Sequence, residues 1–86
     1  PYLVLDDADV PAAAEACAAA RLVNNGQSCI AAKRFLVLPR VRRAFEAALV
    51  AAMAGYGPEP TRPVDRRLGP LARRDLRDEL HDQVTR

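Results

Sequence analysis

The hydrophobic positions of this chain change their period several times, and these changes predict alternating strands and helices. Residues 2–5 form a short apolar run of the kind that makes a buried strand. Residues 6–9 interrupt it, and Asp9 is a good N-cap for a helix over residues 10–24, where alanine dominates. Residues 33–38 form a second strand-like run. A helix between two such strands predicts a parallel β-α-β unit, because parallel strands need a long crossover connection.

Two further helices are predicted after the second strand. The first opens at Pro39, ends at Gly55 and carries an apolar stripe at i, i+4 spacing that consists of Val41, Phe45, Leu49 and Met53. Residues 56–70 hold a concentration of proline and glycine, which indicates a loop. Helical periodicity returns from about Leu71. The predicted fold class is therefore α/β, with a short parallel β-α-β core plus two further helices.

Length and charge narrow the possible functions. The 86 residues suffice for one small domain or part of a larger one, and half of them are hydrophobic, which argues against disorder. A net charge of +2 is nearly balanced. One alternative is a small nucleic-acid-binding helical module built on Arg66, Arg67, Arg73, Arg74 and Arg77. The same segment carries carboxylates, so we expect no nucleic-acid partner; they are Asp65, Asp75, Asp78 and Glu79.

The ends of the chain lead to an expectation about its completeness. It opens at Pro1 directly on strand-like residues and stops at Arg86 within a helical pattern, so we expect a fragment of a larger protein. Continuously apolar strands are normally covered on both faces, and two strands alone leave edges open. We therefore expect the isolated piece to aggregate. No signal peptide and no apolar run near 18 residues is present, so we expect a cytoplasmic protein and no membrane partner.

The most informative stretch surrounds Cys29, which follows the alanine-rich helix and precedes the second strand. Gly26 supplies the permissive backbone needed after a helix, so the loop can hold a thiol out of the core. Cys17, among alanines inside the helix, is better explained as a small buried hydrophobe. The single histidine, His81, lies far along the chain on a charged helix face, and no metal-ligand spacing is present, so we expect no metal site. The stretch reads Leu22-Val23-Asn24-Asn25-Gly26-Gln27-Ser28-Cys29-Ile30-Ala31-Ala32-Lys33.

This stretch resembles the cysteine active-site signature of the aldehyde dehydrogenases. Residues 2–9 resemble the strand and acidic turn upstream of the family's nucleophile, residues 31–35 the start of the strand after it, and residues 69–71 a later Gly-Pro-Leu. The loop at residues 57–68 departs from the family's usual Gly-Asp-Pro opening. The resemblance covers essentially all 86 residues and is closest to members that oxidise succinate semialdehyde and related small aldehydes. It implies that residues 1–86 are a partial catalytic domain, with the cofactor-binding domain mostly absent.

The resemblance also implies roles for individual residues. Cys29 would attack the aldehyde to give a thiohemiacetal, from which NADP or NAD takes a hydride, and the resulting thioester is hydrolysed to the carboxylic acid. The backbone N–H of Cys29 would help to stabilise the oxyanion. Gln27 and Ser28 would shape the loop or contact substrate or cofactor. Independently of the resemblance, Lys33 and Arg34 follow Cys29 closely and would add positive potential near the thiol, whereas side chains at the start of a strand usually serve the structure or face solvent.

Several parts of such an enzyme lie outside this chain. The family's general base is a glutamate in a Glu-Leu-Gly-Gly segment, which would lie just before Pro1. We therefore expect the piece to be inactive alone and, when intact, to belong to a homo-oligomer that acts on a small aldehyde. The alternative is a non-catalytic truncated remnant, or a packing module with no activity of its own. An upstream Glu-Leu-Gly-Gly segment would separate the two.

Overall fold

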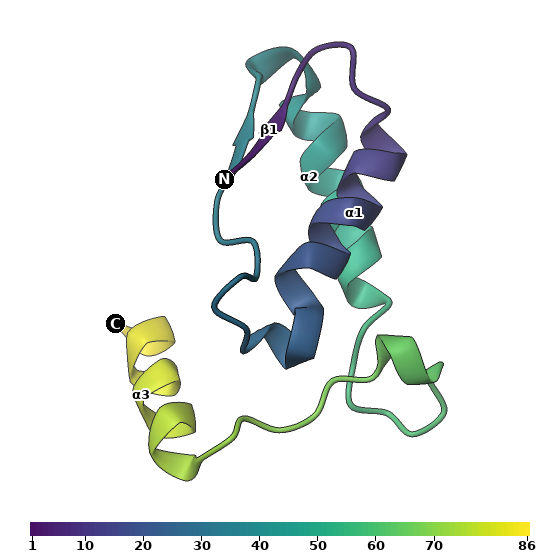
Figure 1. Cartoon of the computed structure of the whole chain (residues 1–86). Coiled ribbons are helices and arrows are strands. Elements are labelled where there is room, and N and C mark those ends of the chain that lie inside the picture. Colours follow the sequence, from purple (N-terminus) through teal and green to yellow (C-terminus); the bar gives the residue numbers. More distant parts are fainter.

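The computed structural model describes residues 1–86 and confirms the predicted α/β class, with one short parallel pair of strands and three α-helices (Figure 1). The elements follow one another as β1 (Tyr2–Val4), α1 (Val10–Leu22), the 3-10 turn η1 (Val23–Gly26), β2 (Phe35–Val37), α2 (Pro39–Ala54), the 3-10 turn η2 (Val64–Arg66) and α3 (Arg74–Thr85).

The two strands pair in parallel and form the only sheet. Leu3 lies opposite Leu36, and the pairing is extended at one end by the Leu38 N–H, which donates to the Val4 carbonyl at 3.1 Å. Helices α1 and α2 lie side by side against one face of this sheet (Figure 1). The crossover through α1 therefore returns the chain to the sheet beside β1, and the 23–34 connection sits at the end of the layer where α1 ends.

The core lies between the sheet and the two helices. Val4, Ala14, Cys17 and Phe45 are buried together, and Phe35 packs on Phe45 with ring centroids 6.3 Å apart. Val41, Phe45 and Leu49 of the predicted α2 stripe face this core, whereas Met53 is not part of it, and the predicted burial of Cys17 is confirmed. Deep packing around Phe45 removes a large apolar surface from water, which is the main favourable term in folding.

The second face of the sheet is uncovered within these residues. Leu3 is 69% exposed and Leu36 is 52% exposed, because alternate side chains of a strand point to opposite faces and only one face meets the helices. Within residues 1–86 these apolar strands are thus covered on one face only, and cover by neighbouring strands of an intact protein stays a prediction.

Helix α1 begins as predicted and ends earlier than predicted. The Asp9 Oδ1 accepts a hydrogen bond from the Ala12 N–H at 3.1 Å, which caps the first turn. The helix stops at Leu22 instead of near residue 24, because Asn24 and Asn25 adopt the left-handed conformation with φ of 50° and 59°. Asparagine tolerates this conformation better than most residues, so the pair redirects the chain toward the cysteine loop.

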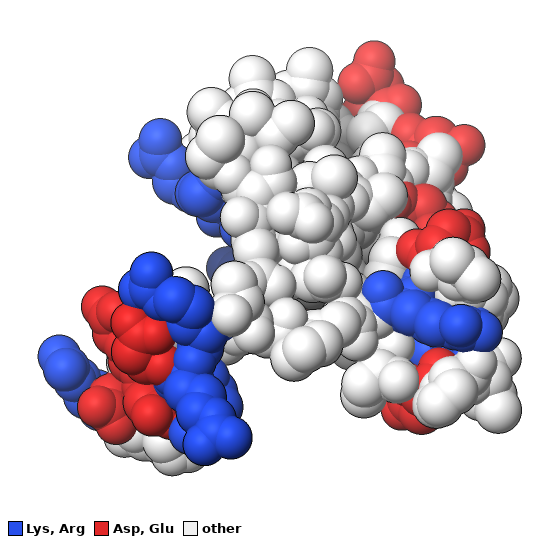
Figure 2. All heavy atoms as spheres, turned by 60° about the horizontal axis from the view of Figure 1, so that its bottom comes forward, with Lys and Arg blue, Asp and Glu red and all other residues white.

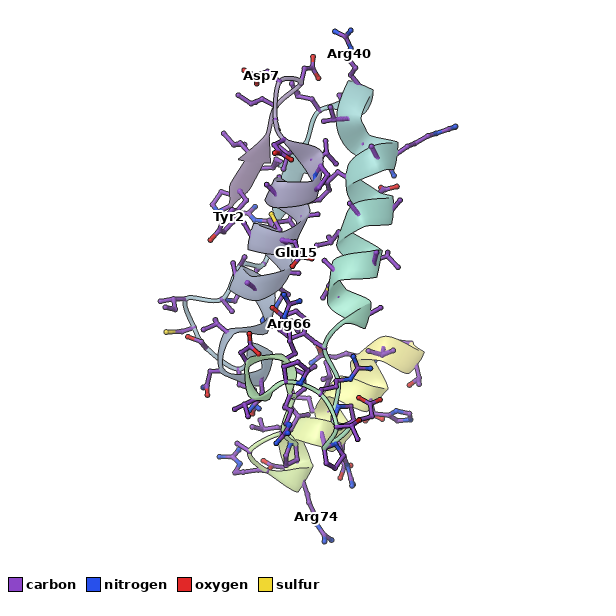
Figure 3. All side chains as sticks on the ribbon, turned by 90° about the vertical axis from the view of Figure 1, so that its right-hand side faces the viewer. Tyr2, Asp7, Glu15, Arg40, Arg66 and Arg74 are labelled. Carbon is purple, nitrogen blue, oxygen red and sulfur yellow. The ribbon has the colours of Figure 1, made fainter.

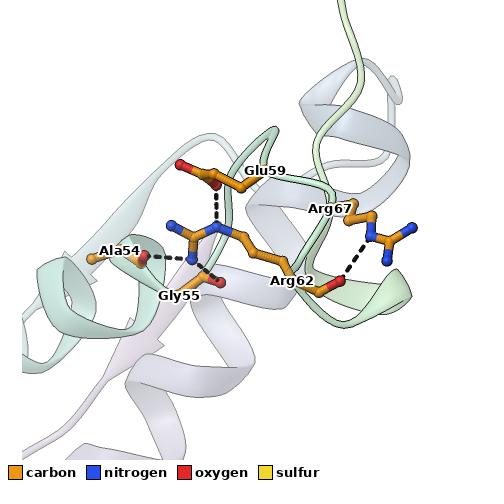
Figure 4. Close-up of polar contacts among 5 residues, drawn as sticks. All are labelled: Ala54, Gly55, Glu59, Arg62 and Arg67. Carbon is orange, nitrogen blue, oxygen red and sulfur yellow. Dashed lines mark hydrogen bonds and ion pairs between the residues drawn. The ribbon is translucent and has the colours of Figure 1, made fainter.

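The segment between α2 and α3 is organised by arginine side chains. Arg62 pairs with the Glu59 carboxylate and donates from Nη1 to the carbonyls of Ala54 and Gly55, at 3.1 and 2.7 Å (Figure 4). Arg66 lies over the ring of Tyr56 and reaches Glu15 on α1 at 3.5 Å (Figure 3). The contacts of Arg62 and Arg66 thus hold the proline-rich loop against the end of α2 and the outer face of α1.

Helix α3 lies apart from the two-helix layer (Figure 1) and begins at Arg74, three positions later than predicted. Leu76, Leu80 and Val84 are all exposed, so its apolar face contacts no core here. Arginines lie beside acidic side chains on and just before this helix (Figure 2). None of the helices combines the length and the apolar character that a transmembrane span requires.

Candidate functional site

Cys29 lies in the connection between α1 and β2 and is exposed, whereas Cys17 is 2% exposed in the core. Burial raises the pKa of the Cys17 thiol, because the thiolate loses its hydration there. The thiolate is the reactive form of cysteine, so burial disfavours both access to Cys17 and its ionisation. The structure therefore leaves one thiol, that of Cys29, open to a reagent or substrate.

The backbone of the cysteine loop is built from two consecutive turns. The Gln27 N–H donates to the Asn24 carbonyl at 3.0 Å, and the Ala31 N–H donates to the Ser28 carbonyl at 3.1 Å. Gly26 lies inside the first turn with φ of 75°, which glycine adopts without the strain that a Cβ would bring. No acceptor within the chain takes the Cys29 N–H. An exposed thiol and an unpaired N–H on the same residue can bond to the carbon and the oxygen of one carbonyl group.

Two basic side chains hold the carbonyls of this loop. The Lys33 Nζ donates to the Cys29 carbonyl at 2.8 Å and to the Ala31 carbonyl at 3.0 Å. Arg21, in the last turn of α1, donates to carbonyls on both sides of Cys29. Arg34 makes no hydrogen bond or ion pair with its side chain. That Lys33 and Arg34 assist the thiol stays a prediction, while the contacts of Arg21 were missed by sequence reasoning.

The side chains of Asn25 and Gln27 face the segment that precedes α3. The Gln27 Oε1 accepts from the Ala72 N–H at 2.9 Å, and its Nε2 donates to the Pro70 carbonyl at 3.2 Å. The Asn25 Oδ1 accepts from the Gly69 N–H at 2.8 Å. These bonds hold residues 69–72 in a non-helical conformation, which explains the late start of α3.

These contacts bear on the roles considered for Gln27 and Ser28. Both the oxygen and the nitrogen of the Gln27 side-chain amide are hydrogen-bonded to backbone groups. This favours a role in shaping the loop over contact with the substrate. The Ser28 Oγ accepts from the Ile30 N–H at 3.4 Å, which is a weak local bond. Residues of the loop and of the 70–76 segment together line an open hollow of about 630 Å³, and Cys29 is not among the residues that line it.

Other candidate chemistry is not assembled in this chain. His81 lies exposed on α3, and no hydrogen bond joins it to Cys29. No group of three or more histidine, cysteine, aspartate or glutamate side chains is placed to hold a metal ion. The site consists of an exposed cysteine on a loop that is anchored to α1, to the start of β2 and to the 69–72 segment.

The sequence model of the aldehyde dehydrogenase family matches residues 1–86. A succinate semialdehyde dehydrogenase (NAD(P)+), Sad, of Escherichia coli (strain K12) is 48% identical over 98% of this chain and 18% of its own length. A succinate-semialdehyde dehydrogenase of Paenarthrobacter nicotinovorans is 40% identical over 99% of the chain and 19% of its own length. The NADP(+) succinate-semialdehyde dehydrogenase 1 of Mycobacterium bovis (strain BCG / Pasteur 1173P2) is 44% identical over 98% of the chain and 18% of its own length.

The chain thus spans less than a fifth of the length of these relatives, and the match runs from its first residue to its last. No solved structure matches it. A family match over every residue, together with close relatives of one kind, agrees with the resemblance carried by the cysteine loop, and the chain belongs to the aldehyde dehydrogenase family.

Proposed function

We propose that residues 1–86 are the cysteine-bearing part of the catalytic domain of a longer NAD(P)-dependent aldehyde dehydrogenase, in which Cys29 is the nucleophile. The observation that carries this proposal is the exposed Cys29 thiol on an anchored loop, inside a segment that matches the family from end to end. The burial of Cys17 removes the only other thiol from consideration.

The chemistry assigned to this chain is covalent catalysis. The Cys29 sulfur bonds to the aldehyde carbon, and the carbonyl oxygen becomes an oxyanion within reach of the Cys29 N–H, which has no acceptor in the chain. The carbon then loses its hydrogen with two electrons, which leaves a thioester on Cys29. Water cleaves the thioester, so that the carboxylic acid leaves and the thiol is restored. When bound, NAD(P)+ supplies the hydride acceptor.

The residues present fit the substrate side of this reaction. They offer a nucleophile and an N–H donor, and they contain no glycine-rich loop before a helix that would cradle the phosphates of a dinucleotide. We therefore place the binding of NADP or NAD, and the general base that activates water, in other parts of the full-length protein. Residues 1–86 alone are expected to be inactive, and NAD(P)-dependent aldehyde oxidation by this purified segment would contradict that assignment.

Succinate semialdehyde is the substrate we propose, because three of the relatives that match the whole chain carry that activity in their names. The full-length protein is proposed to act in the cytoplasm as a homo-oligomer. A substrate series of aldehydes with and without a terminal carboxylate tests the choice. The highest kcat/KM is expected for succinate semialdehyde, and a preference for uncharged aldehydes would overturn it.

The nucleophile is tested by replacing Cys29 with alanine in the full-length protein. Aldehyde oxidation is expected to be lost while the Kd for NAD(P) is unchanged, because the substitution removes the covalent step and leaves the fold intact. Cys17→Ala is the matched control and is expected to keep activity, since that side chain lies in the core. Oxidation at the wild-type rate by the Cys29→Ala protein would refute the assignment.

A further inference from the structure

We infer that Arg21 is a positioning residue that closes the base of the cysteine loop and holds Cys29 in place for its chemistry. The inference rests on the proposed function, since it concerns the residue that acts on the Cys29 loop. The carrying observation is that a single guanidinium group bridges two backbone carbonyls, one on each side of the cysteine.

The bridge is symmetric about the cysteine. The Arg21 Nη2 donates to the Gly26 carbonyl at 2.6 Å, and its Nη1 donates to the Ala32 carbonyl at 2.8 Å. Gly26 lies three residues before Cys29 and Ala32 three residues after it. The guanidinium is planar, and its two terminal nitrogens point in fixed directions, so one side chain sets the separation of the two limbs of the loop. Hydrogen bonds from a charged donor are roughly twice as strong as those between neutral groups.

Arg21 itself stands on a rigid base. It belongs to the last turn of α1, whose Ala14, Cys17 and Ala18 are buried. The Ala32 N–H donates to the carbonyl of Ala20, the residue before Arg21, at 3.0 Å. Both backbone polar groups of Ala32 are therefore tied to the end of α1, and the loop leaves for β2 from a fixed point.

No carboxylate competes for Arg21. None of the ion pairs in the structure includes it, although the chain contains eleven acidic residues. Its side chain is half-buried, and its hydrogen bonds go to the two loop carbonyls alone. A cation at this place also interacts favourably with the C-terminal end of α1. The charge is thus directed at the loop and not at a solvated surface pair.

The loop sets where the Cys29 sulfur and the Cys29 N–H lie relative to a bound carbonyl. Loss of the bridge leaves both limbs free to move apart, and a displacement of about 1 Å at a reacting group can lower a rate by about 10²-fold. Arg21→Met keeps the length and apolar stem and removes all donors. Arg21→Lys keeps the charge and offers donors from one nitrogen, which cannot reproduce the fixed fork.

The test uses the full-length protein with Arg21→Met, Arg21→Lys and the control Arg43→Met, an exposed arginine on α2 without a hydrogen bond. Steady-state kinetics with succinate semialdehyde, the Kd for NAD(P) and the melting temperature are measured for each. We expect Arg21→Met to lower kcat by about 10- to 100-fold, with a smaller change in KM and an unchanged cofactor Kd. Arg21→Lys is expected to recover part of kcat, and Arg43→Met to match the wild type.

Two results would overturn the inference. One is a wild-type kcat for Arg21→Met; the other is a fall in kcat that follows the melting temperature and the cofactor affinity in parallel, which a merely structural role predicts. If Arg21→Met does not fold, Arg21→Lys decides, because wild-type kinetics there would show that the fork is dispensable. Cys29→Ala separates this inference from the proposed function: activity without the cysteine refutes the function, whereas an inactive Cys29→Ala with a normal Arg21→Met refutes the bridge alone.

Discussion

Gln27 and Ala72 lie 45 positions apart and are joined by a hydrogen bond of 2.9 Å from the Ala72 N–H to the Gln27 Oε1. The other end of the same amide donates to the Pro70 carbonyl at 3.2 Å. The cysteine loop and the segment before α3 are therefore held together by one side chain, with Asn25 adding a third bond to Gly69. Each such bond contributes about 1 kcal/mol net.

Gln27→Ala is expected to loosen residues 69–72, because it removes two of the three bonds that hold them to the loop. In the full-length protein, hydrogen exchange at the Ala72 N–H should become about 5- to 10-fold faster, which corresponds to about 1 kcal/mol. Gln27→Glu keeps the acceptor and loses the donor, so Ala72 should stay protected. Gln83→Ala, an exposed glutamine on α3, serves as the control. Unchanged exchange at Ala72 in Gln27→Ala would contradict the reading.

The two cysteines should differ sharply in reactivity. Iodoacetamide is expected to modify Cys29 and to leave Cys17 unmodified in the native full-length protein, because Cys17 is buried and its thiol has a raised pKa. Mass spectrometry of the tryptic peptides identifies the labelled residue. Denaturant should make both cysteines react, which controls for intrinsic reactivity. Preferential labelling of Cys17 in the folded protein would show that the loop is not as open as the structure has it.

Local sequence signals predicted the elements whose ends are set by residues at or next to those ends. Helix α2 runs from Pro39 to Ala54 as expected, because proline fits only the first turn of a helix and Gly55 follows the last. The start of α3 was predicted three residues too early. Its apolar spacing gives no sign that residues 69–72 are held by distant side chains, so only the folded chain reveals the boundary.

The same distinction applies to the candidate site. The setting of Cys29 between a helix and a strand predicted an exposed thiol, since glycine and asparagine mark the bend in the sequence itself. The bridge made by Arg21 could not be predicted, because its acceptors are backbone carbonyls that every sequence contains. A basic residue in the last turn of a helix was the one available signal, and it does not say which carbonyls are reached.

Gly26→Ala should destabilise the protein by roughly 1–2 kcal/mol, because Gly26 has φ of 75° and an alanine pays for the left-handed conformation. A Cβ there would lie 3.5 Å from the Arg21 carbonyl oxygen, which is ordinary contact, so the cost comes from the backbone and not from a clash. Asn24→Gly is the matched control and should leave stability unchanged or raise it. Asn24 has φ of 50°, which glycine adopts without strain, and its side chain makes no hydrogen bond. Urea unfolding of the full-length proteins measures both. Equal stability of Gly26→Ala and wild type would be inconsistent with this conformation.

The Glu59–Arg62 pair predicts a pH dependence at the end of α2. The hydrogen bond from Arg62 holds the pKa of Glu59 below its ordinary value. A carboxyl group with a depressed folded pKa stabilises the fold above its unfolded pKa of about 4.3, and this contribution is lost as the pH falls through the lower folded value. At neutral pH, Glu59→Gln should therefore speed hydrogen exchange in residues 54–62, and the difference should vanish in acid. The effect should be small, because the Glu59 carboxylate is exposed and Arg62 is only half-buried. Glu79→Gln, which lies outside any ion pair, should exchange at the wild-type rate. If the difference in exchange rate between Glu59→Gln and the wild type instead widens in acid, the predicted direction of the pH dependence is wrong.

The uncovered face of the sheet should make residues 1–86 associate when they are produced alone. Leu3 and Leu36 are paired across β1 and β2 and remain 69% and 52% exposed, and both strands have an open edge. Sedimentation velocity should detect species larger than a monomer. Leu36→Lys places a charge in this face and should shift the distribution toward the monomer, whereas Val50→Lys, 69% exposed on α2, should not. A monodisperse wild-type monomer that melts cooperatively would mean that the face needs no cover, and would weaken the view that these residues are completed by the rest of a longer chain.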